Sequence, residues 1–71
     1  MTKKLKLSQW HDGNVKPVHV GIYERQYHYN TMLNYWNGES WRWPADGYLM
    51  AWTLRHELSS SQTLPWRGIV K

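Results

Sequence analysis

The stretch Tyr35-Trp36-Asn37-Gly38-Glu39-Ser40-Trp41 carries the strongest local folding signal in this chain. Asn-Gly between two aromatic-rich runs is the preferred filling of a two-residue type I′ turn, so the stretch predicts a β-hairpin. That turn fixes the strand pairing, with Trp36 opposite Glu39, Asn34 opposite Trp41 and Met32 opposite Trp43. A slip of one residue would turn every side chain to the other face of the sheet.

The two faces of this hairpin differ, because successive residues of a strand point to opposite sides. One face is apolar and predicts the core side of the sheet; it carries Met32, Trp36, Trp41 and Trp43. The opposite face is more polar and is expected to meet solvent; it carries Thr31, Leu33, Tyr35, Ser40 and Arg42.

Two further segments indicate strands. Residues 18–27 begin with β-branched residues that alternate onto one face, namely Val18, Val20 and Ile22. Tyr23 and Tyr27 have the opposite parity, so the buried face is expected to switch within this strand. Residues 64–70 follow a polar loop and predict a short closing strand.

Residues 44–58 admit two interpretations. Pro44-Ala45-Asp46-Gly47 is typical of a type I turn with a glycine bulge, which would lead into a strand over residues 48–54. The competing interpretation is a short helix from Asp46 to Leu58, because Leu54 and Leu58 are four residues apart and would share a helical face. Neither fits cleanly, and the strand is the favoured interpretation.

Together these segments predict an all-β fold: a small, twisted antiparallel sheet of four to five strands that curls toward a barrel or half-barrel. The alternative is an α+β fold with one short helix near residues 46–58. Residues 10–71 are expected to form a single small β domain, and residues 1–9 a flexible basic terminus or an edge strand. The predicted core comprises Val18, Val20, Ile22, Met32, Trp36, Trp41, Trp43 and Trp52.

The 71 residues include six Trp and five Tyr but no Phe and no Cys. A chain of this length buries only about 60% of its unfolded surface, and without cysteine it has no disulfide to add stability. The aromatic residues must therefore build the core, with homodimerisation as the other source of stability. Each of these rings also carries a polar group, which suits surfaces where one end is buried and the other meets a partner.

Nine Lys and Arg against five Asp and Glu give a net charge of +4, which favours contact with nucleic acid or with an acidic protein. No apolar run reaches the roughly 18 residues of a membrane span. The basic start of the chain is not followed by the apolar segment of a signal peptide. The expected location is therefore the cytoplasm.

The titratable residues show no spacing typical of a catalytic or metal site. The four His have no Cys partners and no i, i+4 pair on one helix, and the five acidic residues are scattered. The glycines are isolated and form no phosphate-binding loop. We therefore expect a non-enzymatic protein without a cofactor or a metal.

A mixed aromatic and basic surface is the candidate binding site. The side chains expected to form it are Tyr23, Arg25, Tyr27, Tyr35, Arg42, Trp66 and Arg67. Trp, Tyr and Arg dominate the hot spots of protein interfaces, and the same set can stack unpaired bases while its cations contact phosphates. The third interpretation is that these residues only cover a two-sided sheet and that Trp66 closes its core.

The order of motifs over most of the chain resembles small uncharacterised proteins encoded by bacteriophages and prophages. The resemblance is carried by the hairpin motif Trp-x-Gly-x-x-Trp at residues 36–41 and by the terminal Trp66-Arg67-Gly68. It implies an accessory protein that binds a host protein in the bacterial cytoplasm and inhibits or redirects it. A host protein is therefore the leading hypothesis for the partner, and single-stranded nucleic acid is the alternative.

Overall fold

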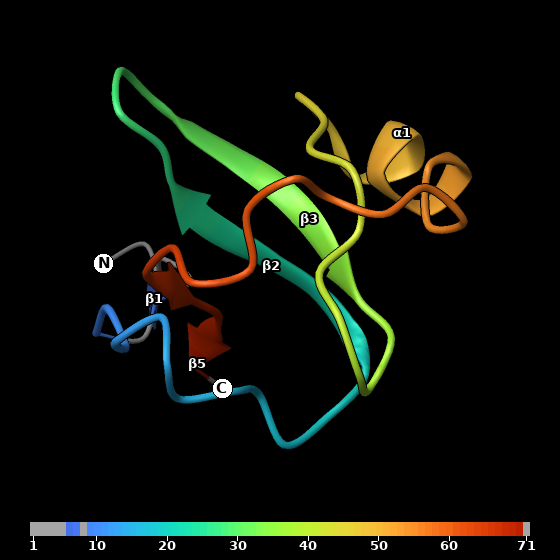
Figure 1. Ribbon diagram of the computed structural model, residues 1–71. Coiled ribbons are helices and arrows are strands. Elements are labelled where there is room, and N and C mark those ends of the chain that lie inside the picture. The colour runs from blue at the N-terminus through green and yellow to red at the C-terminus, as the bar shows by residue number, and fades with distance from the viewer. Residues whose placement is uncertain (1–5, 8, 71) are drawn as a thin grey trace.

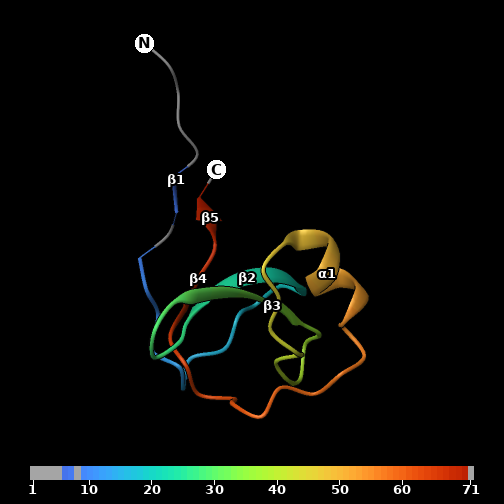
Figure 2. The same ribbon diagram turned by 90° about the horizontal axis from the view of Figure 1, so that it is seen from above.

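The computed structural model describes residues 6–7 and 9–70, which form short strands around one short helix (Figure 1). In chain order, the elements are β1 (Lys6–Leu7), β2 (Gly21–Gln26), β3 (Thr31–Trp36), α1 (Tyr48–Thr53), β4 (Trp66–Arg67) and β5 (Ile69–Val70). β1 and β5 pair with each other and lie side by side at the end of the molecule opposite α1 (Figures 1 and 2).

The main sheet is antiparallel, with β2 between β3 and β4. β2 pairs with β3 along its whole length, from Gly21 opposite Trp36 to Gln26 opposite Thr31. The strand predicted over residues 18–27 is therefore confirmed in its central part. It begins at Gly21 rather than at Val18, because the preceding residues lie in an exposed loop.

The predicted turn at Asn37-Gly38 is present, but its two-residue register is wrong. Trp36 pairs with Trp41 instead of Glu39, so four residues form the loop. The Asn37 side chain explains the longer loop, because its Oδ1 accepts hydrogen bonds from the backbone N–H groups of Glu39 and Ser40 at 2.9 and 2.8 Å. Gly38 has φ = +98°, a backbone conformation that favours glycine.

The favoured strand over residues 48–54 is wrong. The alternative of a short helix is correct in type, but α1 covers only Tyr48–Thr53 of the predicted range 46–58. α1 begins after Gly47 and contacts β3 and β2. A strand would place apolar side chains on both of its faces. The helix instead points Ala51 toward Leu33 of the sheet. Ala51 is fully buried and packs in one cluster with Leu33 and Ala45, with Leu54 packed against that cluster.

The sheet differs from the expected barrel. Within the described residues the main sheet has three strands and is not closed, and β1 with β5 forms a separate pair. The predicted closing strand over residues 64–70 appears as two short strands on either side of Gly68. The expectation for residues 1–9 falls partly on residues 1–5 and 8, which lie outside the described residues; Lys6 and Leu7 form β1.

Two apolar clusters lie on opposite faces of the sheet. Leu33 of the first cluster and Trp36 of the second are three residues apart on β3, so their side chains point to opposite faces. The first contains Leu33, Ala45 and Ala51, with Ile22 and Leu54 packed against it on the α1 side. The second contains Trp36, Trp41 and Trp66, with Tyr23 packed against it. β2 and β3 are therefore covered on both faces, and the expected single core face does not exist.

The predicted core is correct at Trp36 and Trp41, which are buried, whereas Ile22 and Met32 are only half-buried. Four other predicted core residues are exposed: Val18, Val20, Trp43 and Trp52. The two valines precede β2 in an exposed loop. Leu33, expected at the solvent face, is buried because α1 covers that face.

Candidate functional site

None of the seven predicted binding residues is exposed. Arg25 and Trp66 are buried, and the remaining five are half-buried: Tyr23, Tyr27, Tyr35, Arg42 and Arg67. They also lie on both faces of the sheet, since Arg25 and Trp66 share one face while Tyr35 and Arg67 belong to the other. The structure therefore does not bring them together as one outward surface.

Arg25 differs from the exposed cation expected at this position, because its side chain is fully buried. Its guanidinium lies over the Trp41 ring, with 4.6 Å between Cζ and the ring centroid, and 5.8 Å from the centroid of Tyr27. Its three side-chain nitrogens have no hydrogen-bond partner among the described residues. Burial lowers the pKa of Arg25 below its usual value. Arg25 is thus a buried cation held by aromatic rings.

Tyr23 and Trp66 belong to the aromatic cluster. The Tyr23 ring meets Trp66 and Trp41 edge-on, at centroid distances of 5.2 and 5.8 Å, and its hydroxyl donates to the His19 carbonyl at 2.7 Å. Burial raises the pKa of Tyr23 above its usual value. Trp66 Nε1 donates to the Val15 carbonyl at 2.6 Å, so Trp66 closes the core.

Arg42 holds the chain that follows α1. Its Nε donates to the Arg55 carbonyl and its Nη2 to the His56 carbonyl, both at 2.9 Å, while Nη1 donates to Ser40 Oγ at 2.8 Å. All three guanidinium nitrogens are therefore engaged within the fold. These hydrogen bonds connect the loop after β3 to the chain that follows α1.

Arg67 and Glu24 form an ion pair across β2 and β4. Arg67 Nε lies 2.9 Å from Glu24 Oε1, and the guanidinium lies over the Trp10 ring at 4.4 Å from its centroid. Of the nine Lys and Arg in the sequence, Arg25 is therefore buried, Arg67 is paired with Glu24, and Arg42 is hydrogen-bonded within the fold.

Four exposed apolar side chains lie together on α1. We name this set the α1 surface, and it comprises Leu49, Tyr48, Met50 and Trp52, with exposed fractions of 79, 52, 52 and 47%. Ala51 is the buried residue of the helix. A helix that is apolar on every side is normally buried all round, and exposed apolar patches mark interaction sites. The apolar residues of the run Tyr48–Thr53 could have indicated such a surface in the sequence, but the run was interpreted as a strand.

Trp52 is held in a defined orientation at this surface. Its ring meets the Tyr35 ring edge-on at a centroid distance of 5.5 Å. Arg55 Cζ lies 3.8 Å from the centroid of the same ring, and Arg55 Nη1 donates to the Trp52 carbonyl at 2.7 Å. Tyr35, a predicted site residue, therefore contributes as a support for Trp52. A half-exposed, supported Trp beside an Arg is typical of a protein-binding hot spot.

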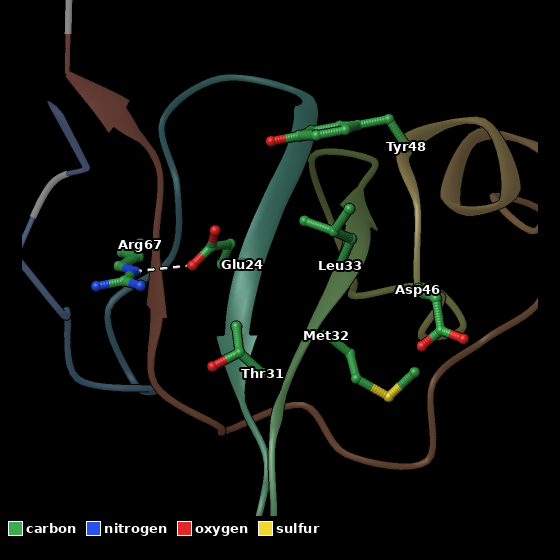
Figure 3. Close-up of a pocket in the computed structure, with 7 residues that line it drawn as sticks. All are labelled: Glu24, Thr31, Met32, Leu33, Asp46, Tyr48 and Arg67. Carbon is green, nitrogen blue, oxygen red and sulfur yellow. Dashed lines mark hydrogen bonds and ion pairs between the residues drawn. The ribbon is translucent and has the colours of Figure 1, made fainter. Parts of the chain in front are cut away.

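A groove opens on the same face of the sheet as α1. We name it the Tyr48 groove; it has a volume of about 350 Å³ and is lined by Glu24, Thr31, Met32, Leu33, Asp46, Tyr48 and Arg67. Figure 3 shows the Tyr48 ring extended across one end, Asp46 at one wall and the Arg67–Glu24 ion pair at the opposite wall. Tyr48 belongs both to the groove and to the α1 surface.

Comparisons with protein-family models, with curated proteins and with solved structures gave no match. The resemblance to bacteriophage proteins therefore stays a prediction. In the described part of the chain, no three His, Cys, Asp or Glu side chains are grouped so that they could hold a metal ion. Among those same residues, no helix has the length and apolarity needed to cross a membrane.

Proposed function

We propose that this chain is a non-enzymatic protein-binding domain and that the α1 surface is its contact surface. The observation that carries the proposal is the exposure of Tyr48, Leu49, Met50 and Trp52 on a helix with a single buried residue, Ala51. Exposed apolar side chains on this scale have an unfavourable free energy in water, which a partner relieves by covering them.

The mode of binding follows from the shape of this surface. A short helix that presents Leu49 and Trp52, three residues apart, fits an apolar groove of a partner in the way amphipathic helices do. Tyr35 and Arg55 both contact the Trp52 ring and restrict its orientation, so little side-chain entropy is lost on binding. The partner in this proposal is a protein with an apolar cleft.

The biological setting of the proposal comes from the resemblance to bacteriophage and prophage proteins. In that setting the partner is a host protein in the bacterial cytoplasm, which the domain inhibits or redirects. The single-stranded nucleic-acid alternative would use the seven aromatic and basic side chains on the sheet. It is the weaker proposal, because Arg25 is buried and Arg42 and Arg67 are engaged within the fold.

Affinity capture from bacterial lysate with three forms of the tagged chain tests the α1 surface. Leu49→Asp places a charge at its centre, and Val18→Asp is the matched control because Val18 is 90% exposed and lies in the loop before β2. After nuclease treatment, the unmodified chain and Val18→Asp should retain the same host protein, and Leu49→Asp should lose it. With the purified partner, Leu49→Asp should weaken the Kd at least about tenfold.

Two outcomes would contradict the proposal. Retention of the same partner by Leu49→Asp would move the contact surface away from α1. Loss of all captured material on nuclease treatment would instead favour nucleic acid. A salt titration would then be decisive, since each neutralised phosphate contributes a slope of about −0.7 in log K against log salt for single strands.

A further inference from the structure

We propose that the Tyr48 groove is a binding site for an arginine side chain of the partner. The inference rests on the proposed protein-binding function, because Tyr48 is shared between the groove and the α1 surface. A partner lying on α1 can therefore extend a side chain into the groove without leaving the surface. A volume of about 350 Å³ is at the small end of the range for ligand sites, which suits one side chain.

The charges of the groove select a cation. Its lining contains two carboxylates, Glu24 and Asp46, and one guanidinium, Arg67, so one negative charge remains. Arg67 Nε is bound to Glu24 Oε1, and no ion pair is formed by Asp46 within the described residues. The unpaired carboxylate of Asp46 is therefore the group that a cationic side chain would meet.

The aromatic wall of the groove favours a planar cation. Tyr48 is 52% exposed. Figure 3 shows its ring extending over the groove. A guanidinium can stack on such a ring while it donates two parallel hydrogen bonds to a carboxylate, whereas an ammonium forms a single point contact. The buried side chain of Leu33 and the half-buried Met32 would contact the aliphatic part of the arginine.

The local charge of this site is opposite to the net charge of the sequence. The chain carries +4 overall, which predicts an acidic partner. Two of its arginines nevertheless present no free charge, because Arg25 is buried and Arg67 is paired with Glu24. The exposed carboxylate of Asp46 therefore determines the charge that this groove presents. A basic side chain is the matching occupant even though the sequence is basic.

The site can be tested on the full chain without the partner. Uniformly ¹⁵N-labelled protein is titrated with N-acetyl-arginine amide and, in parallel, with N-acetyl-citrulline amide, which has nearly the same shape but no charge. The arginine compound should give saturable shifts at the amides of Thr31, Leu33, Asp46 and Tyr48. The citrulline compound should give shifts that do not saturate.

Variants assign the binding to the groove. Asp46→Asn should weaken the affinity for the arginine compound at least about tenfold, because it removes a charge-assisted hydrogen bond. Glu57→Gln is the matched control, since Glu57 is another exposed carboxylate outside the groove, and its affinity should not change. Tyr48→Leu removes the ring and should also weaken binding, which keeps the test valid if Asp46→Asn does not fold.

The outcomes separate this inference from the proposed function. Equal shifts with arginine and citrulline, shifts away from the groove, or unchanged affinity in both Asp46→Asn and Tyr48→Leu would overturn the arginine site. Tighter binding of N-acetyl-lysine amide would overturn the choice of arginine. Neither result depends on Leu49. The capture experiment with Leu49→Asp can therefore support the α1 surface even when the arginine site is disproved, and the arginine site can be supported when the α1 surface is disproved.

Discussion

At the scale of single residues, the burial of a side chain in this domain depends on whether another segment of the chain packs against it. Arg25 is fully buried, and Val18 is 90% exposed, which is the reverse of their usual preferences. Arg25 points from β2 toward Trp41, whose ring covers its guanidinium. Val18 precedes β2 in an exposed loop. Intrinsic polarity could not have predicted either placement.

Gly13 shows how closely the chain is packed at one residue. A Cβ atom at this position would lie 1.7 Å from the carbonyl oxygen of Thr63. Gly13→Ala must therefore displace backbone, and we expect it to lower the free energy of unfolding by at least about 2 kcal/mol. Urea denaturation followed by Trp fluorescence measures this loss.

Gly21→Ala is the control for that experiment. A Cβ at Gly21 would meet only the Tyr23 ring, at an ordinary contact distance of 3.9 Å. Since alanine is favoured over glycine in a strand, its effect should lie between neutral and about 1 kcal/mol of stabilisation. A loss of stability at Gly21 that equals the loss at Gly13 would contradict the steric explanation.

At the scale of elements, α1 is held mainly by its surroundings. It has six residues, no side-chain hydrogen bond at its N-cap, no acidic residue in its first turn and no basic residue in its last turn. Helices of this length are not stable in isolation. The Ala51 contact with Leu33 and the Arg42 hydrogen bonds to the chain after α1 therefore keep it in place.

Arg42→Ala should loosen this connection. The variant loses three hydrogen bonds, two of them to the carbonyls of Arg55 and His56, so we expect a loss of roughly 1–3 kcal/mol in the free energy of unfolding. Arg55→Ala is the matched control. It loses one exposed hydrogen bond and the contact with the Trp52 ring, so its loss should stay below about 1 kcal/mol.

Chemical denaturation of both arginine variants decides between two roles for Arg42. A similar small effect of the two substitutions would mean that Arg42 does not hold the end of α1. In that case Arg42 would again be a candidate for contact with a partner, as the sequence suggested.

At the scale of the whole molecule, Trp66 joins segments that are far apart in the sequence. Its backbone pairs with His11, its ring stacks on that imidazole at 4.3 Å, and it packs in one cluster with Trp36 and Trp41. The start of the chain, the main sheet and the loop after β3 therefore meet at one side chain. Such long-range pairing makes folding depend on the complete chain.

Trp66→Ala should unfold the domain. Removing a buried Trp costs about 3–5 kcal/mol, which equals the total stability expected of a domain of this size. Trp43→Ala is the control, because Trp43 is 47% exposed and lies outside both clusters, so this variant should keep a cooperative thermal transition. Far-UV and near-UV circular dichroism with thermal melting distinguishes the two. A cooperative melt of Trp66→Ala near the Tm of the unmodified chain would show that this cluster is dispensable.

The sequence alone determined the features that depend on neighbouring residues. The turn at Asn37-Gly38, most of β2 and the burial of Trp36 and Trp41 followed from local conformational preference and from the need to build a core without cysteine. The spacing of Leu54 and Leu58 also indicated a helix, but the helix that forms ends at Thr53 and Leu58 is exposed, so these two residues do not share a helical face. These signals act over a few residues and so are visible in the chain itself.

Only the tertiary structure decided which faces are covered. Because α1 covers one face of β2 and β3 and the Trp41 segment covers the other, alternation of apolar residues could not single out one buried face. The same arrangement buries Arg25, engages Arg42 and exposes Leu49. Burial is a property of two surfaces in contact, and the second surface comes from residues distant in the sequence. The candidate site on α1 therefore became visible only in the folded chain.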